Sequence, residues 1–190
     1  MRKLILPLIL GLLISCNQAD NKLIYEEFID GYYNDGFESI AELLSDSIII
    51  ADIEEYKMKY SKQEFEVYYK WDSVFKPEYS VLELGPITDS TINVTQSVTS
   101  KRFEFLDNSP LITRHRFYFT DNNITKIENV EYLNVDFDVW IARRDSLVNW
   151  INRNHEELSG FIFDMTQEGA EDYLKAIELY QTATLSANSN

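Results

Sequence analysis

One histidine lies in the middle of a strand-like segment, where a titratable side chain has a use in catalysis or ligand binding. The segment Leu111 to Thr120 reads LITRHRFYFT, and successive side chains of a β-strand point to opposite faces of the sheet. One face therefore carries His115 with Phe117 beside it, while the other carries two arginines. We expect the His115 side to line a cavity and the arginine side to face water or a helix.

A carboxylate at the end of another β-branched segment is the candidate partner of this histidine. Asp52 closes the segment SIIIAD and shares a strand face with Ile48 and Ile50. A carboxylate beside an imidazole holds its tautomer and raises its basicity, so with a water the pair could drive a dehydration, an epoxide opening or a proton shift. We expect Asp52 and His115 to lie within a hydrogen bond or one water of each other. The alternative is structural: an interior, hydrogen-bonded His115 and an Asp52 that caps the turn after its strand.

Aromatic residues on two predicted helices are candidates to line the same cavity. Apolar residues recur at helical spacing over 23–33, and Asn34-Asp35-Gly36 ends that helix. A second aromatic helix starts at the capping-box sequence Ser61 to Glu64 and ends before Pro77. The predicted ligand-binding residues are Phe28, Tyr32, Tyr68, Trp71 and Phe117. The alternative is that the aromatics of the second helix only fill the core.

The remaining segments predict helices combined with a sheet. A short helix over 37–44 precedes the strand that ends at Asp52, and 54–60 is either a loop or a short strand. Strands over 79–84, 92–106, 111–120 and 124–133 indicate a meander of about four antiparallel strands, with a bulge in the long segment 92–106. From Asp136 onward the pattern is helical, with Thr166 as the cap of the last helix.

The order of these elements and two local sequences resemble the NTF2-like superfamily, which includes SnoaL-like proteins and ketosteroid isomerase. The sequences are YYNDGFESIAELLSDSIIIAD over 32–52 and RFYFTDNNITKIENVEYL over 116–133. The resemblance covers 22–134 and implies an α+β NTF2-like cone, with N-terminal helices packed on a bent antiparallel sheet. A C-terminal helical extension over 135–184 lies outside it. A cystatin-like domain, with a similar layout and fewer N-terminal helices, is the alternative.

The resemblance also bears on three positions of the isomerase active site. It implies that Asp52 falls where the isomerase keeps its aspartate base, and that His115 falls at or near its protonated aspartic acid. Phe28 falls where the isomerase has a tyrosine donor, so that donor is lost here. Because losing one oxyanion donor costs on the order of a hundredfold in rate, isomerase activity is not the expected function.

The N-terminus is typical of a bacterial lipoprotein precursor. Arg2 and Lys3 precede an apolar run from Leu4 to Ile14 that is too short to span a bilayer, and Leu13 to Cys16 resembles a lipobox. We therefore predict a signal peptide over 1–15, a tether over 16–21 and a polar tail over 185–190. Two acyl chains on Cys16 would anchor the protein to a membrane of the cell envelope, in the periplasm or at the outer membrane. The alternative is an ordinary secretory signal with a chance cysteine.

Composition limits the partners. A net charge of −15 opposes binding to nucleic acid or to an anionic membrane surface. Cys16 is the only cysteine, and His155-Glu156-Glu157 lacks the second histidine of a zinc-protease helix, so we expect neither a metal nor a cofactor. We expect a monomer rather than a homodimer, because the apolar stripe that includes Trp140 and Ile151 must cover some surface.

The expected function is binding of a small apolar ligand or a protein partner in the cell envelope. One alternative is a cofactor-independent acid–base enzyme, of the isomerase, dehydratase or epoxide-hydrolase type, that uses Asp52 and His115. Another is an immunity or assembly role in which the cavity is vestigial. The binding function and the acid–base enzyme both need the cone predicted around His115. The geometry of Asp52 and His115 within that cone distinguishes the two.

Overall fold

The computed structural model describes the backbone of residues 6–53 and 56–188, and the side chains of 18–53 and 56–186. The predicted signal residues 1–5 and the side chain of Cys16 lie outside this described part. Helix α1 (Leu6–Asp30) includes the backbone of 16–21, the segment predicted to be a tether. None of the described helices is long and apolar enough to cross a membrane.

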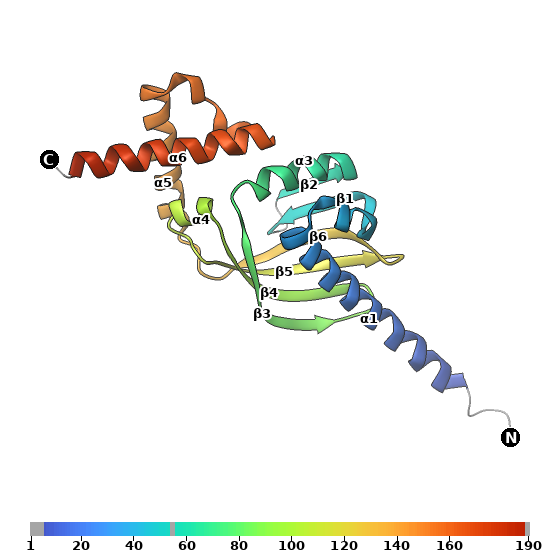
Figure 1. The fold of residues 1–190 in the computed structure, drawn as a ribbon. Helices are drawn as coiled ribbons and strands as arrows, with labels where there is room; N and C mark the ends of the chain where they lie inside the picture. Colours follow the sequence, from blue (N-terminus) through green and yellow to red (C-terminus); the bar gives the residue numbers. More distant parts are fainter. Residues whose placement is uncertain (1–5, 54–55, 189–190) are drawn as a thin grey trace. The chain divides into compact units, whose positions relative to one another are not determined.

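The described residues combine helices with one sheet, as the predicted α+β class requires (Figure 1). The strands are β1 (Leu44–Asp52), β2 (Tyr56–Ser61), β3 (Glu78–Ile87), β4 (Thr91–Thr99), β5 (Leu111–Thr120) and β6 (Asn123–Tyr132). Their order in the sheet is β2-β1-β6-β5-β4-β3. After α1 the helices are η1 (Gly31–Asp35), α2 (Phe37–Ile40), η2 (Ala41–Leu43), α3 (Lys62–Ser73), α4 (Lys101–Phe105), α5 (Phe137–Asn154), η3 (Glu156–Leu158), η4 (Phe161–Phe163) and α6 (Gln167–Asn188).

Two predicted details of the sheet are wrong. Strand β1 pairs with β6 in parallel, with Asp52 opposite Asn129, so the sheet is mixed rather than antiparallel. Strand β4 ends at Thr99 instead of continuing to Leu106, because Ser100 accepts a hydrogen bond from the backbone N–H of Phe103 and starts helix α4. A serine that caps a helix in this way ends a strand that the apolar pattern would otherwise continue.

The chain consists of two compact units. Unit 1 consists of Met1–Gln63, Val81–Gln96 and Thr113–Glu131. Unit 2 consists of Glu64–Ser80, Ser97–Ile112 and Tyr132–Asn190. Unit 1 thus holds α1, β1, β2 and most of β3 to β6, while unit 2 holds α4 to α6 and most of α3.

In unit 1, helix α1 packs on β5 through aromatic side chains. The Phe117 ring lies 5.0 Å from the Tyr25 ring and 5.9 Å from the Phe28 ring, centre to centre. Asn21 Nδ2 donates to the backbone oxygen of Asp89 at 3.0 Å, which fixes α1 to the turn between β3 and β4. The helical turn after α1 ends at Gly36, whose φ of +101° suits glycine, so the predicted break at Asn34-Asp35-Gly36 is confirmed.

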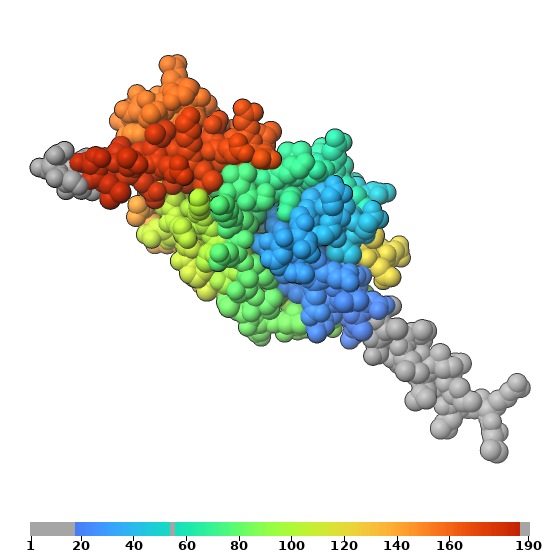
Figure 2. Space-filling view, viewed as in Figure 1, coloured from blue at the N-terminus to red at the C-terminus, as the bar shows by residue number. Residues whose placement is uncertain are grey.

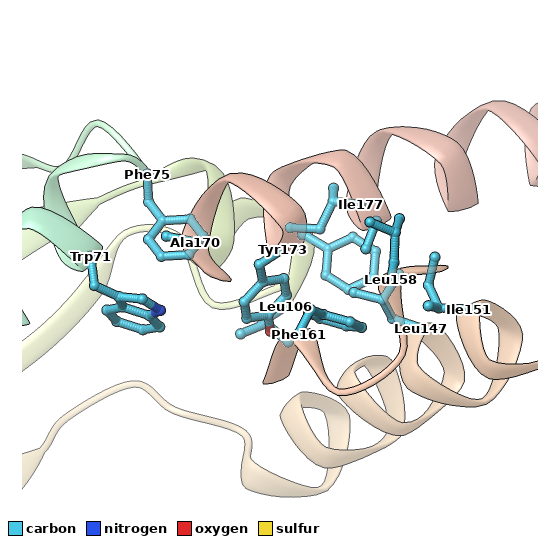
Figure 3. Close-up of a cluster of buried hydrophobic side chains, with 12 residues drawn as sticks. Trp71, Phe75, Leu106, Leu147, Ile151, Leu158, Phe161, Ala170, Tyr173 and Ile177 are labelled. Carbon is cyan, nitrogen blue, oxygen red and sulfur yellow. The ribbon is translucent and has the colours of Figure 1, made fainter. Parts of the chain in front are cut away.

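Unit 2 has its own apolar core, in which the C-terminal helices cover each other. Leu147 and Ile151 of α5 are fully buried in a cluster with Tyr173 and Ile177 of α6 and with Trp71 of α3 (Figure 3). In the space-filling view, the orange and red surfaces of α5 and α6 are continuous (Figure 2). The apolar stripe predicted on α5 is therefore buried in its second half, within this unit.

Candidate functional site

The two faces of β5 differ as the sequence predicts. Phe117 and Phe119 are buried, whereas Arg114 is exposed. His115 lies on the face of Phe117, with 6.5 Å between the two ring centres, and it is only partly exposed. We call this side of the unit 1 sheet the His115 face; on β5 it consists of Thr113, His115, Phe117 and Phe119.

Burial sets the charge of the histidine. It lowers the pKa of His115 from 6.5 to about 4, because an imidazolium loses hydration when it leaves water. His115 is therefore neutral at pH 7, with one ring nitrogen as a hydrogen-bond donor and the other as an acceptor. A nearby carboxylate would raise this pKa, and burial is the cause that dominates here.

Asp52 has an amide as its partner. Asn129 Nδ2 donates to Asp52 Oδ1 at 2.8 Å, and the two residues are opposite each other in the β1–β6 register. The backbone N–H of Ile53 also donates to the backbone oxygen of Asn129 at 2.8 Å. The structure thus places the Asn129 amide against the Oδ1 atom of Asp52, and the predicted pairing of Asp52 with His115 stays a prediction.

A glutamine of β4 shares the His115 face. The buried residues of this strand alternate regularly and include Ile92, Val94 and Gln96. Asn93, on the opposite face, accepts a hydrogen bond from Arg116 Nε at 2.8 Å. Because Arg116 and His115 are consecutive in β5, they point to opposite faces. Gln96 therefore lies on the same face as His115.

Two buried amide oxygens of unit 1 have no hydrogen-bond partner. They are Gln96 Oε1 and Asn129 Oδ1, in residues that are 5% and 8% exposed. Leaving a buried polar atom unsatisfied costs about 1–3 kcal/mol. Glu128 binds Tyr118, which lies on the arginine side of β5. The next residue, Asn129, points to the opposite face of the sheet, where it binds the side chain of Asp52. Both acceptors therefore belong to the His115 face.

The predicted aromatic residues fall into two groups. Phe28, Tyr32 and Phe117 lie in unit 1, where the Phe28 ring is 5.7 Å from the Tyr32 ring. Tyr68 and Trp71 lie in unit 2, where their rings stack at 6.2 Å and join the buried cluster there. Within unit 1 the structure therefore brings Phe28, Tyr32 and Phe117 together with one another and places Phe117 beside His115.

Sequence reasoning missed Gln96 and Asn129. A signal for Gln96 is present, because it occupies an inward position in the alternating run from Ile92 to Val98. Asn129 carries no such signal, because its position depends on the parallel pairing of β1 with β6. Among the described residues, no group of three or more His, Cys, Asp and Glu side chains is placed to hold a metal ion.

The opposite face of the sheet carries a buried acidic group. Glu128 is 4% exposed; its carboxylate accepts from Lys126 Nζ at 2.6 Å and from the Tyr118 hydroxyl at 2.5 Å. Burial by itself raises the pKa of Glu128, but these hydrogen bonds and the charges of Lys126 and Arg116 outweigh it and lower the pKa. This face is therefore organised by paired charges rather than by apolar contacts.

We expect Glu128→Gln to lower the free energy of unfolding by about 1.5–3 kcal/mol, because Lys126 and the Tyr118 hydroxyl lose a charged hydrogen-bond acceptor. Urea unfolding at pH 7 measures this loss. Glu131→Gln is the matched control: Glu131 is on the same strand, and its ion pair with Arg114 is exposed. The control should change stability by no more than about 1 kcal/mol. Equal losses in the two variants would contradict a buried role for Glu128.

Comparison with solved structures identifies the fold. A Kribbella flavida protein named as a candidate ketosteroid isomerase is similar with a TM-score of 0.51 and 9% identity, over 62% of this chain and 81% of that chain. Another Kribbella flavida protein, described only as of known function, gives a TM-score of 0.50 and 10% identity, over 65% and 94%. A SnoaL-like protein of unknown function from Burkholderia thailandensis gives 0.49 and 11%, over 62% and 98%.

At these identities the likeness shows the fold and nothing more. The chain has the α+β fold of NTF2-like and ketosteroid isomerase-like proteins, as its element order predicts. No family model matches the sequence, and no curated protein matches it. Function must therefore be argued from the His115 face itself.

Proposed function

We propose that the His115 face of unit 1 binds a small, mainly apolar ligand that carries a hydroxyl or N–H donor. The observation that carries this proposal is the pair of buried, unpartnered acceptors, Gln96 Oε1 and Asn129 Oδ1, on the sheet face that also carries Phe117. A donor on the ligand would satisfy one of these oxygens, and the ring of Phe117 would contact its apolar body. Neutral His115 offers a further donor or acceptor.

The pKa of His115 favours binding over acid–base catalysis. A general base works best with a pKa near the working pH. A pKa of about 4 makes His115 a weak base at pH 7. The hydrogen bond from Asn129 also engages one oxygen of Asp52, the other predicted catalytic group. Both residues are better suited to hold a polar group of a ligand than to move its proton.

Phenol and anisole are a matched pair of probes for this proposal, because they share an apolar ring and only phenol donates a hydrogen bond. We expect phenol to shift the side-chain amide resonances of Gln96 and Asn129 saturably in an NMR titration. Anisole should bind at least about tenfold more weakly, because leaving one buried acceptor unpaired costs about 1–3 kcal/mol.

Variants on the two faces of β4 provide the control. Gln96→Met removes the buried oxygen, keeps the length of the side chain, and should weaken phenol binding by about tenfold. Asn93→Ser changes the opposite face, where Asn93 binds Arg116, and should leave phenol binding unchanged. Equal affinities for phenol and anisole would contradict the proposal, and equal effects of the two variants would exclude Gln96 Oε1 as the acceptor and leave Asn129 Oδ1.

We further propose that Cys16 is acylated and holds this binding domain at a membrane of the cell envelope. The lipobox-like sequence Leu13 to Cys16 supports this assignment, and two acyl chains suffice for stable anchoring. Cys16→Ser should move the protein from the membrane fraction to the soluble fraction, or leave it unprocessed. A wild-type protein that carries no fatty acid by mass spectrometry would contradict the anchor.

A further inference from the structure

A cationic side chain of unit 2 is enclosed by aromatic rings. The Arg102 Cζ atom lies 4.7 Å from the centre of the Trp71 ring, 5.3 Å from that of Phe75 and 4.9 Å from that of Phe103. Such contacts stabilise a guanidinium by cation–π attraction. They do not satisfy its N–H groups, which point along the plane of the guanidinium.

Donors of two touching groups are left without partners here. Arg102 Nε and Trp71 Nε1 are both buried and have no hydrogen-bond acceptor. Trp71 as a whole is 5% exposed. Each unsatisfied donor costs about 1–3 kcal/mol, and more where the group is charged. The aromatic enclosure therefore holds one guanidinium N–H, at Nε, and one indole N–H that are buried without an acceptor.

Arg102 is an exception among the arginines of the described residues. Arg114, Arg143 and Arg144 form ion pairs with Glu131, Asp107 and Asp145, respectively. The other two have hydrogen-bond acceptors, which are Asn93 Oδ1 for Arg116 and the backbone oxygen of Asn149 for Arg153. The chain has 32 acidic residues and 17 basic ones, so countercharges are abundant. None of the described carboxylates forms an ion pair with Arg102.

The charges of two arginines, Arg102 and Arg144, act on one buried tyrosine of α6. Tyr173 of α6 packs on Phe75 with 5.5 Å between ring centres, and Phe75 in turn lies next to Trp71 (Figure 3). Burial raises the pKa of Tyr173, and the charges of Arg102 and Arg144 partly oppose this rise. Two guanidinium groups thus act on one buried phenol, in a chain whose net charge is −15.

We propose that Arg102 and Trp71 form a binding site for the carboxylate of an apolar ligand. A guanidinium and a carboxylate form charge-assisted hydrogen bonds, and the second carboxylate oxygen is an acceptor for the indole N–H. The rings of Trp71, Phe75 and Phe103 would contact the apolar part of the ligand. A phosphate dianion fits less well, because the negative chain repels the additional charge and the apolar surroundings penalise its burial.

This site lies in unit 2 and uses none of the residues of the His115 face, so the two proposals fail independently. Sodium butyrate is the probe, with sodium chloride at equal ionic strength and inorganic phosphate for comparison. Butyrate should shift the indole N–H resonance of Trp71 and the Nε–H resonance of Arg102 saturably, with a dissociation constant of about 1–10 mM. Chloride should not do so, and phosphate should bind more weakly.

Arg102→Gln and Arg143→Gln form the matched pair of variants. Arg102→Gln should weaken butyrate binding at least about tenfold, because it removes the guanidinium that would pair with the carboxylate. Arg143 pairs with an exposed Asp107, and its replacement should leave butyrate binding unchanged. The wild-type titration decides the matter even if Arg102→Gln fails to fold. A Trp71 indole resonance that butyrate does not move, or that phosphate moves at lower concentration, would overturn the carboxylate site, as would undiminished binding to a folded Arg102→Gln variant.

Discussion

Phe117→Ala should lower the free energy of unfolding by about 3–5 kcal/mol, the usual loss for a buried phenylalanine. The residue is 2% exposed, and its ring contacts both Tyr25 and Phe28 of α1. Removing it deletes apolar contacts and leaves a cavity between the helix and β5, which the surrounding rings can fill only in part. Urea unfolding followed by far-UV circular dichroism measures the loss.

The same substitution at an exposed phenylalanine is the control. Phe163 of η4 is 86% exposed, so Phe163→Ala should change stability by less than about 0.5 kcal/mol. A loss below about 1 kcal/mol at Phe117 would contradict the packing of α1 on β5. Because Phe117 is next to His115 on its face of the sheet, that result would also undermine the proposed ligand contacts.

The second large expected effect is a fall in the free energy of unfolding at acidic pH, caused by the burial of His115. Its pKa is about 4 in the folded protein and 6.5 when it is solvated. Above pH 6.5 the imidazole of His115 is neutral in both the folded and the unfolded protein, so it causes no pH dependence of the unfolding free energy. As the pH falls from 6.5 to 4, the unfolded chain binds a proton that the folded chain does not, so folding becomes less favourable. Because one pKa unit is worth about 1.4 kcal/mol, the loss reaches about 3 kcal/mol.

Comparison with His115→Gln separates this effect from the titration of the carboxylates. The difference in unfolding free energy between wild type and variant should be constant above pH 6.5. It should change in favour of the variant by up to about 3 kcal/mol by pH 4. An NMR titration of the wild type gives the pKa of His115 directly. A value near 6.5 would show that the imidazole is solvated, and would remove the main argument against a catalytic role.

Local patterns in the sequence predict the parts of this structure that depend on one element at a time. The alternation in LITRHRFYFT predicts which side chains of β5 are buried, because strand periodicity is a local property. The helix end near Asn34-Asp35-Gly36 is predicted because these turn-forming residues are also a local signal. The apolar stripe of α5 likewise predicts the burial of Ile151.

What the sequence does not predict depends on pairing between distant segments. Asn129 becomes the neighbour of Asp52 only because β1 and β6 pair in parallel, and no local pattern contains that information. Ser100 ends β4 by a capping bond that competes with an apolar run predicting a longer strand. The aromatic enclosure of Arg102 arises from Trp71 of α3 and Phe103 of α4 together, and no local pattern around Arg102 contains that information.

A crystal structure of the protein with phenol tests the central proposal most directly. The proposal predicts phenol on the His115 face, with its ring against Phe117 and its hydroxyl about 2.5–3.0 Å from Gln96 Oε1 or Asn129 Oδ1. Phenol bound only elsewhere on the molecule, or on this face with its hydroxyl turned away from both oxygens, would contradict it.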